Sequence, residues 1–363
     1  MLAVSILQFV QFARRSSYNR NNMKKVFSSV SVFVASVVGA GFATGKELIV
    51  FFGKSFAPLV FVGLIVAFSL LFLAILFLSI STNSFDAKTL SSNILGKLDF
   101  CYDVFLVAVS LVMTASMLAG GNDVLCMCFN ISTPFFGIVT AFLVALLFCF
   151  KSQKIATILC KVTTVFIVFF TILLFTAKRQ TFATSSIFST MNSVGMYASF
   201  NVVCSIGAIC NQAKDMTKKQ AVISAVVSAV ILASMSAMLL SILDESSLLI
   251  PTLQLVKHQP FLYWFGVVVV FLAIVSTLWA NALPLVERVE KKVQNKSIAV
   301  LIVFGVGWLL SNVGFDNIVK VCYPAVSVLS VAISLTLICK LLTTKKPRKP
   351  SKGRWDAKGK NLN

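Results

Sequence analysis

Three glycines lie close together in residues 37–47, VVGAGFATGKE, and a Lys46-Glu47 pair follows them at once inside a long apolar run. Glycine weakens a helix by about 1 kcal/mol relative to alanine. Inside a membrane, backbone that leaves the helical hydrogen-bond pattern is tolerated only beside protein or a water-filled cavity. We therefore predict a discontinuous helix, in which residues 26–38 form the first half and a shorter second half runs to Phe52. The alternative is a continuous helix whose small residues pack closely against a neighbour.

Glu47 is the candidate for charge chemistry at this position. Acidic side chains inside membrane-spanning segments are rare, and they typically mark ion pathways or proton relays. Glu47 could therefore gate a pathway, pair with Lys46 or another base, or carry a proton. The alternative is a helix-end charge that faces the outer vestibule.

A second polar interruption lies in residues 192–201, NSVGMYASFN. Tyr197 and Asn201 are four residues apart, so they share one face of a helix. Ser199 adds a hydroxyl between them. Gly39 and Gly195 are separated by 156 residues (195 − 39), and we predict a second discontinuous helix here.

The composition indicates the elements that must carry these residues. Of 363 residues, 58% are hydrophobic and only 12% are charged, whereas soluble domains have about 25% charged residues. A membrane-spanning helix needs about 20 mostly apolar residues. Ten runs meet this need approximately, which predicts an all-α, polytopic membrane protein. We place the spans at 26–52, 56–80, 100–128, 133–150, 155–177, 190–213, 219–243, 261–285, 298–313 and 318–342.

The basic residues set the expected orientation and the terminal segments. The net charge is +20, and with ten spans 26 of the 32 Lys and Arg residues fall on the side that holds both termini. Basic residues accumulate on the cytoplasmic side, so both termini are predicted to be cytoplasmic and no nucleic-acid partner is needed to explain the charge. Residues 1–25 form an N-terminal extension, 26–342 the core and 343–363 a basic tail.

The core divides into two similar halves, 26–177 and 190–342, of five spans each. Because five is odd, the second half enters the membrane from the opposite side. Broken first helices at corresponding positions of two inverted repeats indicate a secondary transporter with its site near the bilayer midplane. The sequence contains no HExxH motif and no P-loop, so we do not expect an enzyme.

Residues Val38 to Glu47 resemble the signature of the YkvI-type membrane proteins, distant members of the amino acid–polyamine–organocation superfamily. The segments Tyr197–Asn201, Pro251–Leu253, Gly314–Phe315 and Tyr323–Pro324 are also similar to that family. The sequence departs from the family at Lys46 and Phe200, where Gln and Tyr are more usual. The resemblance spans about residues 23 to 342.

The resemblance implies a LeuT-type fold in which spans one and six are unwound around the substrate. The substrate-binding residues that it implies are Gly39, Ala40, Gly41, Phe42, Tyr197, Ser199 and Asn201. It also implies a sodium site made by the carbonyls of Ala35 and Val38 and the hydroxyls of Ser276 and Thr277. For the two hydroxyls, the alternative is a hydrogen bond to a carbonyl one turn earlier in the helix.

These features together predict a secondary active transporter in the cell membrane. It would move a small, amino-acid-like solute by alternating access, coupled to sodium or protons. The alternatives are a passive channel or facilitator, or a non-transporting membrane protein on the same fold. The expected partners are the substrate and the lipid bilayer, and no cofactor is expected beyond the sodium ion. The sequence carries no signal for the oligomeric state.

Overall fold

The part of the chain described by the computed structural model comprises residues 23–53, 57–96, 99–149, 153–177, 186–214, 216–243 and 250–343. Every regular element in these ranges is a helix, and the first helical segment covers residues 23–37. The predicted N-terminal extension up to residue 22 and the basic tail from residue 344 lie outside them. The other helices are α2 (Ala40–Thr44), α3 (Lys46–Phe52), α4 (Ala57–Thr82), α5 (Ala87–Leu95), α6 (Asp99–Phe129), α7 (Phe136–Cys149), α8 (Gln153–Ala177), α9 (Ile187–Cys204), α10 (Ile206–Gln212), α11 (Lys218–Leu240), α12 (Pro251–Leu255), α13 (Pro260–Val293), α14 (Lys296–Ser311), α15 (Phe315–Asn317), the π-helix η2 (Ile318–Cys322) and α16 (Tyr323–Thr343).

Each of the ten predicted spans corresponds to helical structure. Five helices are long and apolar enough to cross a membrane, and the bent pair α9–α10 is a sixth candidate. The apolar parts of α7, α8 and α14 are shorter, and the remaining span is the broken first one. The largest difference in bounds is in span eight, which was predicted to end at residue 285. The structure extends α13 to Val293, because a strongly charged, helix-forming segment continues beyond the apolar run.

The first span is discontinuous, as predicted. The Gly39 amide donates to the Val37 carbonyl at 2.9 Å instead of to the residue four positions earlier, and Gly39 is extended (φ −110°, ψ −161°). Helix α2 then ends at Gly45, whose φ of +74° is left-handed. This conformation is costly for residues with a Cβ. The span is therefore three helical pieces separated at residues 38–39 and at Gly45.

The sixth span is also discontinuous, but the predicted position of its break was wrong. Helix α9 runs without interruption through residues 192–201, and the chain turns by 65° at Ser205, between α9 and α10. Gly195 has no heavy atom within 4 Å of the position where a Cβ would lie. Asn201 donates its side-chain amide to the Tyr197 carbonyl at 3.0 Å, so this polar side chain is satisfied within the helix and does not interrupt it.

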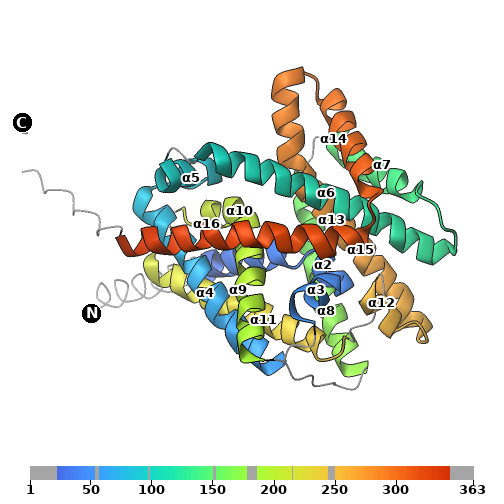
Figure 1. Ribbon diagram of the computed structural model, residues 1–363, viewed down its shortest axis with the longest axis horizontal. Coiled ribbons are helices and arrows are strands. Elements are labelled where there is room, and N and C mark those ends of the chain that lie inside the picture. The colour runs from blue at the N-terminus through green and yellow to red at the C-terminus, as the bar shows by residue number, and fades with distance from the viewer. Residues whose placement is uncertain are drawn as a thin grey trace, which may run out of the picture.

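Two groups of helices hold the broken first span between them. Helices α6, α7, α13 and α14 pack on one another, and α4 packs on α9, α11 and α16; Figure 1 shows α7 and α14 on one side of the molecule and α4, α9 and α11 on the other. Buried alanines recur every four residues in α11, at positions 221, 225, 229 and 233, which allows close contact with α4. Helix α2 packs on α13, and α3 packs on α9. The first span thus contacts both groups.

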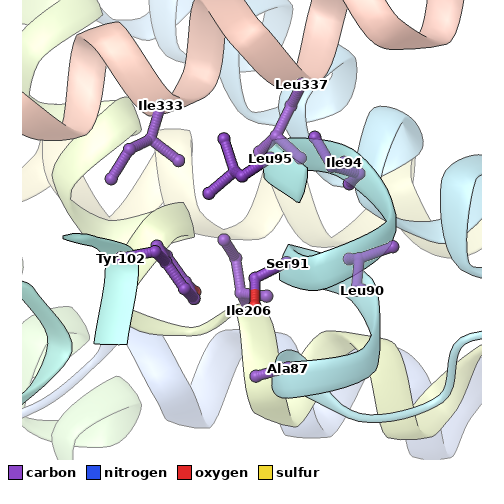
Figure 2. Close-up of a pocket in the computed structure, with 9 residues that line it drawn as sticks. All are labelled: Ala87, Leu90, Ser91, Ile94, Leu95, Tyr102, Ile206, Ile333 and Leu337. Atoms are coloured by element: carbon purple, nitrogen blue, oxygen red, sulfur yellow. The ribbon is translucent and has the colours of Figure 1, made fainter. Parts of the chain in front are cut away.

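The short amphipathic helix α5 lies between spans two and three and packs beside α10. Asp86 caps its first turn by accepting a hydrogen bond from the Thr89 amide at 2.8 Å. Leu90 and Ile94 face Ile206 of α10 and Leu337 of α16 around a small apolar cavity of about 10 Å³ (Figure 2). Helix α5 therefore covers the end of the broken sixth span on the side predicted to be cytoplasmic.

Candidate functional site

Glu47 lies at the centre of the molecule rather than at a solvated helix end. Its side chain is only 4% exposed and folds back over α2, so that a Cβ added at Gly41 would lie 3.3 Å from both Cβ and Cδ of Glu47 and closer still to Oε2. The carboxylate therefore rests directly on the backbone at Gly41. Only a glycine leaves this space.

Asn201 joins this carboxylate to the sixth span. Its Nδ2 donates to Glu47 Oε1 at 3.3 Å as well as to the Tyr197 carbonyl. Tyr197 is fully buried, and the centre of its ring lies 5.4 Å from that of Phe51 and 5.2 Å from that of Phe52. The structure thus brings Glu47 together with Tyr197 and Asn201, which lie 150 (197 − 47) and 154 (201 − 47) residues further along the sequence.

Spans three and ten complete this centre. Phe200 and Tyr323 are both buried, with ring centres 5.2 Å apart. The Tyr323 hydroxyl donates to Ser116 Oγ at 3.1 Å. Neither Tyr323 nor Ser116 was predicted as a site residue, although Tyr323 belongs to one of the segments that resemble the YkvI-type proteins. The centre is consequently lined by helices from both halves of the chain.

Thr277 in span eight contacts the break in span one. Its hydroxyl accepts a hydrogen bond from the Ala40 amide at 3.2 Å, and a Cβ on Gly39 would lie 2.9 Å from the same oxygen. Gly39 is therefore needed for the close approach of α13. Ser276 instead donates to the Ala273 carbonyl at 3.0 Å, which is the hydrogen bond one turn earlier that was the alternative to sodium binding.

The break also releases backbone oxygens. The amide of Gly39 bonds to Val37, and the amide of Ala40 bonds to Thr277. The carbonyl of Ala35 would be the partner of Gly39 in a continuous helix, so it is freed from the helical ladder. The carbonyl of Val38 follows directly, at the break itself. These are the two carbonyls that the resemblance implies for sodium.

A buried ion pair closes the centre on the side predicted to be outer. Lys46 is 1% exposed, and its Nζ lies 2.5 Å from Asp316 Oδ1. Lys320 contacts the other oxygen of Asp316 at 2.7 Å. Lys46 and Glu47 thus diverge: Lys46 binds the connection before span ten, and Glu47 turns inward.

The loop before span eight covers the same side. Thr252 in α12 donates its hydroxyl to the Ala43 carbonyl at 2.8 Å. A Cβ on Gly45 would lie 2.9 Å from Leu243 and 3.1 Å from Thr252. Beyond this cover, a pocket of about 550 Å³ lies near the outer end of α6, beside Asn122 and Asp123. These contacts cover the buried centre around Glu47 on the side predicted to be outer.

Comparison with known proteins was informative only at the level of structure. No family model matches the chain, and no curated protein matches it in sequence. The crystal structure of MhsT in complex with L-phenylalanine is similar over 86% of this chain and 88% of that one, with a TM-score of 0.57 and 13% identity. The chain has a LeuT-type fold. A manganese transporter from Eremococcus coleocola, crystallised with an aromatic bis-isothiourea compound, is aligned over 90% of this chain and 72% of that one, at 12% identity and a TM-score of 0.42.

Within this LeuT-type fold, the other predicted substrate-binding residues fall in two places. Ala40 and Phe42 are fully buried in α2, next to Gly41. Ser199 is also buried, but it lies about 200° around the α9 axis from Tyr197 and so points away from the Glu47 centre. Among the described residues, no cluster of three His, Cys, Asp or Glu side chains could hold a metal ion. Membership of the YkvI-type family stays a prediction.

Proposed function

We propose that the protein is a secondary active transporter of a small, amino-acid-like solute, working by alternating access. The observation that carries this proposal is the hydrogen bond between Glu47 in broken span one and Asn201 in broken span six, at a buried centre of the LeuT-type fold. Discontinuous helices from two inverted halves are the usual setting of a transporter's binding site. MhsT, which shares the fold, was crystallised with L-phenylalanine, and this supports an amino-acid-like solute.

The residues that would bind the solute surround this centre. Gly39, Ala40, Gly41 and Phe42 would form one wall, and Tyr197 and Asn201 would form another. The Lys46–Asp316 ion pair and the Thr252–Ala43 hydrogen bond tie the wall of span one to the outer connections. Access from outside would require both contacts to break, so they are the elements expected to move.

Sodium is one candidate for the coupling ion, and the residues fit it. Sodium is a hard cation, and hard cations take oxygen ligands from carbonyls and hydroxyls. The carbonyls of Ala35 and Val38 belong to the break, and Thr277 lies against the break with a hydroxyl that retains acceptor capacity. Ser276 would supply a fourth oxygen, since a hydroxyl that donates a hydrogen bond still has lone pairs. The proton is the second candidate, with Glu47 as its carrier.

The proposal includes the wider organisation of the chain. The transporter core would be residues 26–342, in repeats 26–177 and 190–342. The excess of basic residues on one side supports a location in the cell membrane with both termini cytoplasmic. An enzymatic role is not part of the proposal.

Uptake by sealed proteoliposomes tests it. Candidate amino acids and amines are offered while a sodium gradient and a pH gradient are imposed separately. Accumulation above equilibrium supports a coupled carrier, and the gradient that drives it identifies the ion. Equilibration without accumulation would indicate a passive facilitator, and absence of any uptake would contradict the proposal.

Two variants in helix α9 test whether transport depends on the assigned centre. Asn201→Ala removes the amide that binds Glu47, and we expect it to abolish accumulation. Asn192→Ala makes the same chemical change at an exposed position of α9 and should transport normally. Equal transport by both variants would exclude the assigned centre.

A further inference from the structure

Most of the hydrogen-bonding capacity of Glu47 is unused. A carboxylate has about four acceptor sites, whereas the described residues supply Glu47 with one hydrogen bond, from Asn201 at 3.3 Å. The donating nitrogen also serves the Tyr197 carbonyl at 3.0 Å. The centre is therefore under-supplied with donors for a buried acid.

Glu47 also lacks a cation. Among the described residues, the ion pairs join Lys46 to Asp316, Lys320 to Asp316 and Arg288 to Asp103. An ionised carboxylate buried without a partner is strongly unfavourable, and such groups become neutral instead. Glu47 is accordingly expected to hold a proton whenever no cation is paired with it.

The elements packed against α3 do not offer another charge. The titratable groups within electrostatic reach of Glu47 are the phenol of Tyr197 and the thiol of Cys204 on α9, and the phenol of Tyr323 on α16. The cations of α3 and η2, Lys46 and Lys320, are both held by Asp316. Helix α2 has no titratable residue, and the lysines of α11 stand in its first turn.

Aromatic rings supply the remaining surface of the centre. Phe51, Tyr197, Phe200 and Tyr323 are all buried. The ring centre of Phe51 lies 5.4 Å from that of Tyr197 and 5.9 Å from that of Phe200, and the ring centre of Phe200 lies 5.2 Å from that of Tyr323. The faces of aromatic rings attract cations. A carboxylate bordered by such rings is the arrangement that recognises an ammonium group.

The same geometry opposes an anionic group at the break. The carboxylate of Glu47 rests on the backbone at Gly41, so an incoming carboxylate would meet it directly. The first amide of α2, at Ala40, is already bound to Thr277. The Ala40 amide is therefore not available to bind the carboxylate of a zwitterion.

We propose that the transported solute is an organic cation, an amine whose ammonium pairs with Glu47 and replaces a proton there. This inference rests on the transport function proposed above, but it replaces the amino-acid-like solute by an amine that carries no carboxylate. The exchange balances as follows: neutral Glu47 releases its proton to the side that is open, and the ammonium of the solute then pairs with the carboxylate. Inward movement of the amine is thereby coupled to outward movement of a proton, or the reverse.

Thermal stabilisation of the purified protein tests the charge preference. The probes are phenethylamine, L-phenylalanine and 3-phenylpropionate, which share a phenyl ring and differ in charge, with putrescine as a second cation. Ligands stabilise the folded state by mass action, and we expect stabilisation by the two amines at the lowest concentrations. Stronger stabilisation by L-phenylalanine or 3-phenylpropionate would overturn the proposal, and so would failure of both amines.

Amine binding by a Glu47 variant, and its dependence on pH, test whether Glu47 is the group that binds the ammonium. Glu47→Gln keeps the shape but not the charge, and it should weaken amine binding on the order of ten- to a hundredfold. Glu287→Gln, at an exposed position of α13, should leave binding unchanged. Because a proton is displaced, amine affinity should rise about tenfold per pH unit in the wild type and not in Glu47→Gln; a pH-independent affinity would contradict the exchange.

Transport separates the two proposals. Amine binding that depends on Glu47 but gives no uptake in proteoliposomes would refute the carrier function and retain the ammonium site. Uptake of L-phenylalanine with no binding of either amine would retain the carrier and overturn the ammonium site. Amine uptake that acidifies the opposite compartment supports both.

Discussion

Replacement of Gly41 by alanine should disrupt the centre while leaving the fold intact. The new methyl group would lie 3.3 Å from Cβ and Cδ of Glu47 and nearer to Oε2. Ordinary contacts need about 3.5 Å, so the carboxylate must swing away by on the order of 1 Å. Because Oε1 is already 3.3 Å from Asn201 Nδ2, this movement breaks the hydrogen bond between the two broken spans.

The expected magnitude follows from two opposing effects. Alanine in place of a helical glycine stabilises a helix by about 1 kcal/mol, and this gain applies in α2. Crowding of a packed core costs about 1–3 kcal/mol, and a lost hydrogen bond to a charged or buried partner adds about 1–3 kcal/mol. We therefore expect a net destabilisation of about 1–5 kcal/mol and at least a tenfold loss of uptake.

Gly195→Ala is the matched control, because it is also a helical glycine of a predicted discontinuous span. No heavy atom lies within 4 Å of its added Cβ, so only the gain in helix stability remains. The assays are thermal unfolding of both purified variants and uptake by proteoliposomes at equal protein content. If Gly41→Ala matches Gly195→Ala in stability and in uptake, the placement of Glu47 over Gly41 is refuted.

Three further outcomes are expected. Asp316→Asn removes the acid that pairs with buried Lys46 and should destabilise the protein by about 2 kcal/mol, whereas Lys46→Met should cost less. In thermal unfolding, the double variant should lose less stability than the sum of the two single losses. Additive losses would refute the pairing. Thr277→Val removes the acceptor of the first α2 amide and should lower the free energy of unfolding by about 1–2 kcal/mol. If sodium is the coupling ion, this variant should also lose the stimulation of uptake by sodium. Hydrogen bonds from the Thr89 hydroxyl and amide lower the pKa of Asp86 below its ordinary 3.8, so this cap adds stability above about pH 4 that is lost as the pH falls further. Asp86→Asn should remove that dependence in unfolding measured across pH 3–6.

The membrane spans were predictable because each span is indicated by the hydrophobicity of many residues together. Lipid requires long apolar runs with internal hydrogen bonds, and many residues report the same constraint, so single exceptions do not hide it. The break in span one was predictable for a related reason. Three glycines beside two charges are unfavourable in any continuous membrane helix, and Gly45, with its left-handed backbone, shows that the pattern was read correctly.

The residues that contact the site from distant parts of the chain were not predictable in the same way. Asp316 was recognisable only as an acid in a connection, because nothing in its neighbours along the chain indicates that Lys46 lies 2.5 Å away. Tyr323 and Thr252 appeared in segments that resemble a family, which gave positions but no contacts. Such pairings depend on how helices distant in sequence are placed side by side.

The two broken spans interrupt their helices in different ways, and this explains why the predicted position of the break in span six was wrong. In span one, glycines remove side chains so that Thr277 and Glu47 can contact the backbone directly. In span six, the polar residues 192–201 lie in an intact helix, and the turn occurs where the Ser205 amide is shared between the carbonyls of Asn201 and Val202, at 3.1 Å each. A shared amide bends a helix without exposing many backbone groups, so it needs no cluster of glycines. The irregular backbone is thus concentrated in span one, and span six contributes an intact helical face that places Tyr197 and Asn201 beside Glu47.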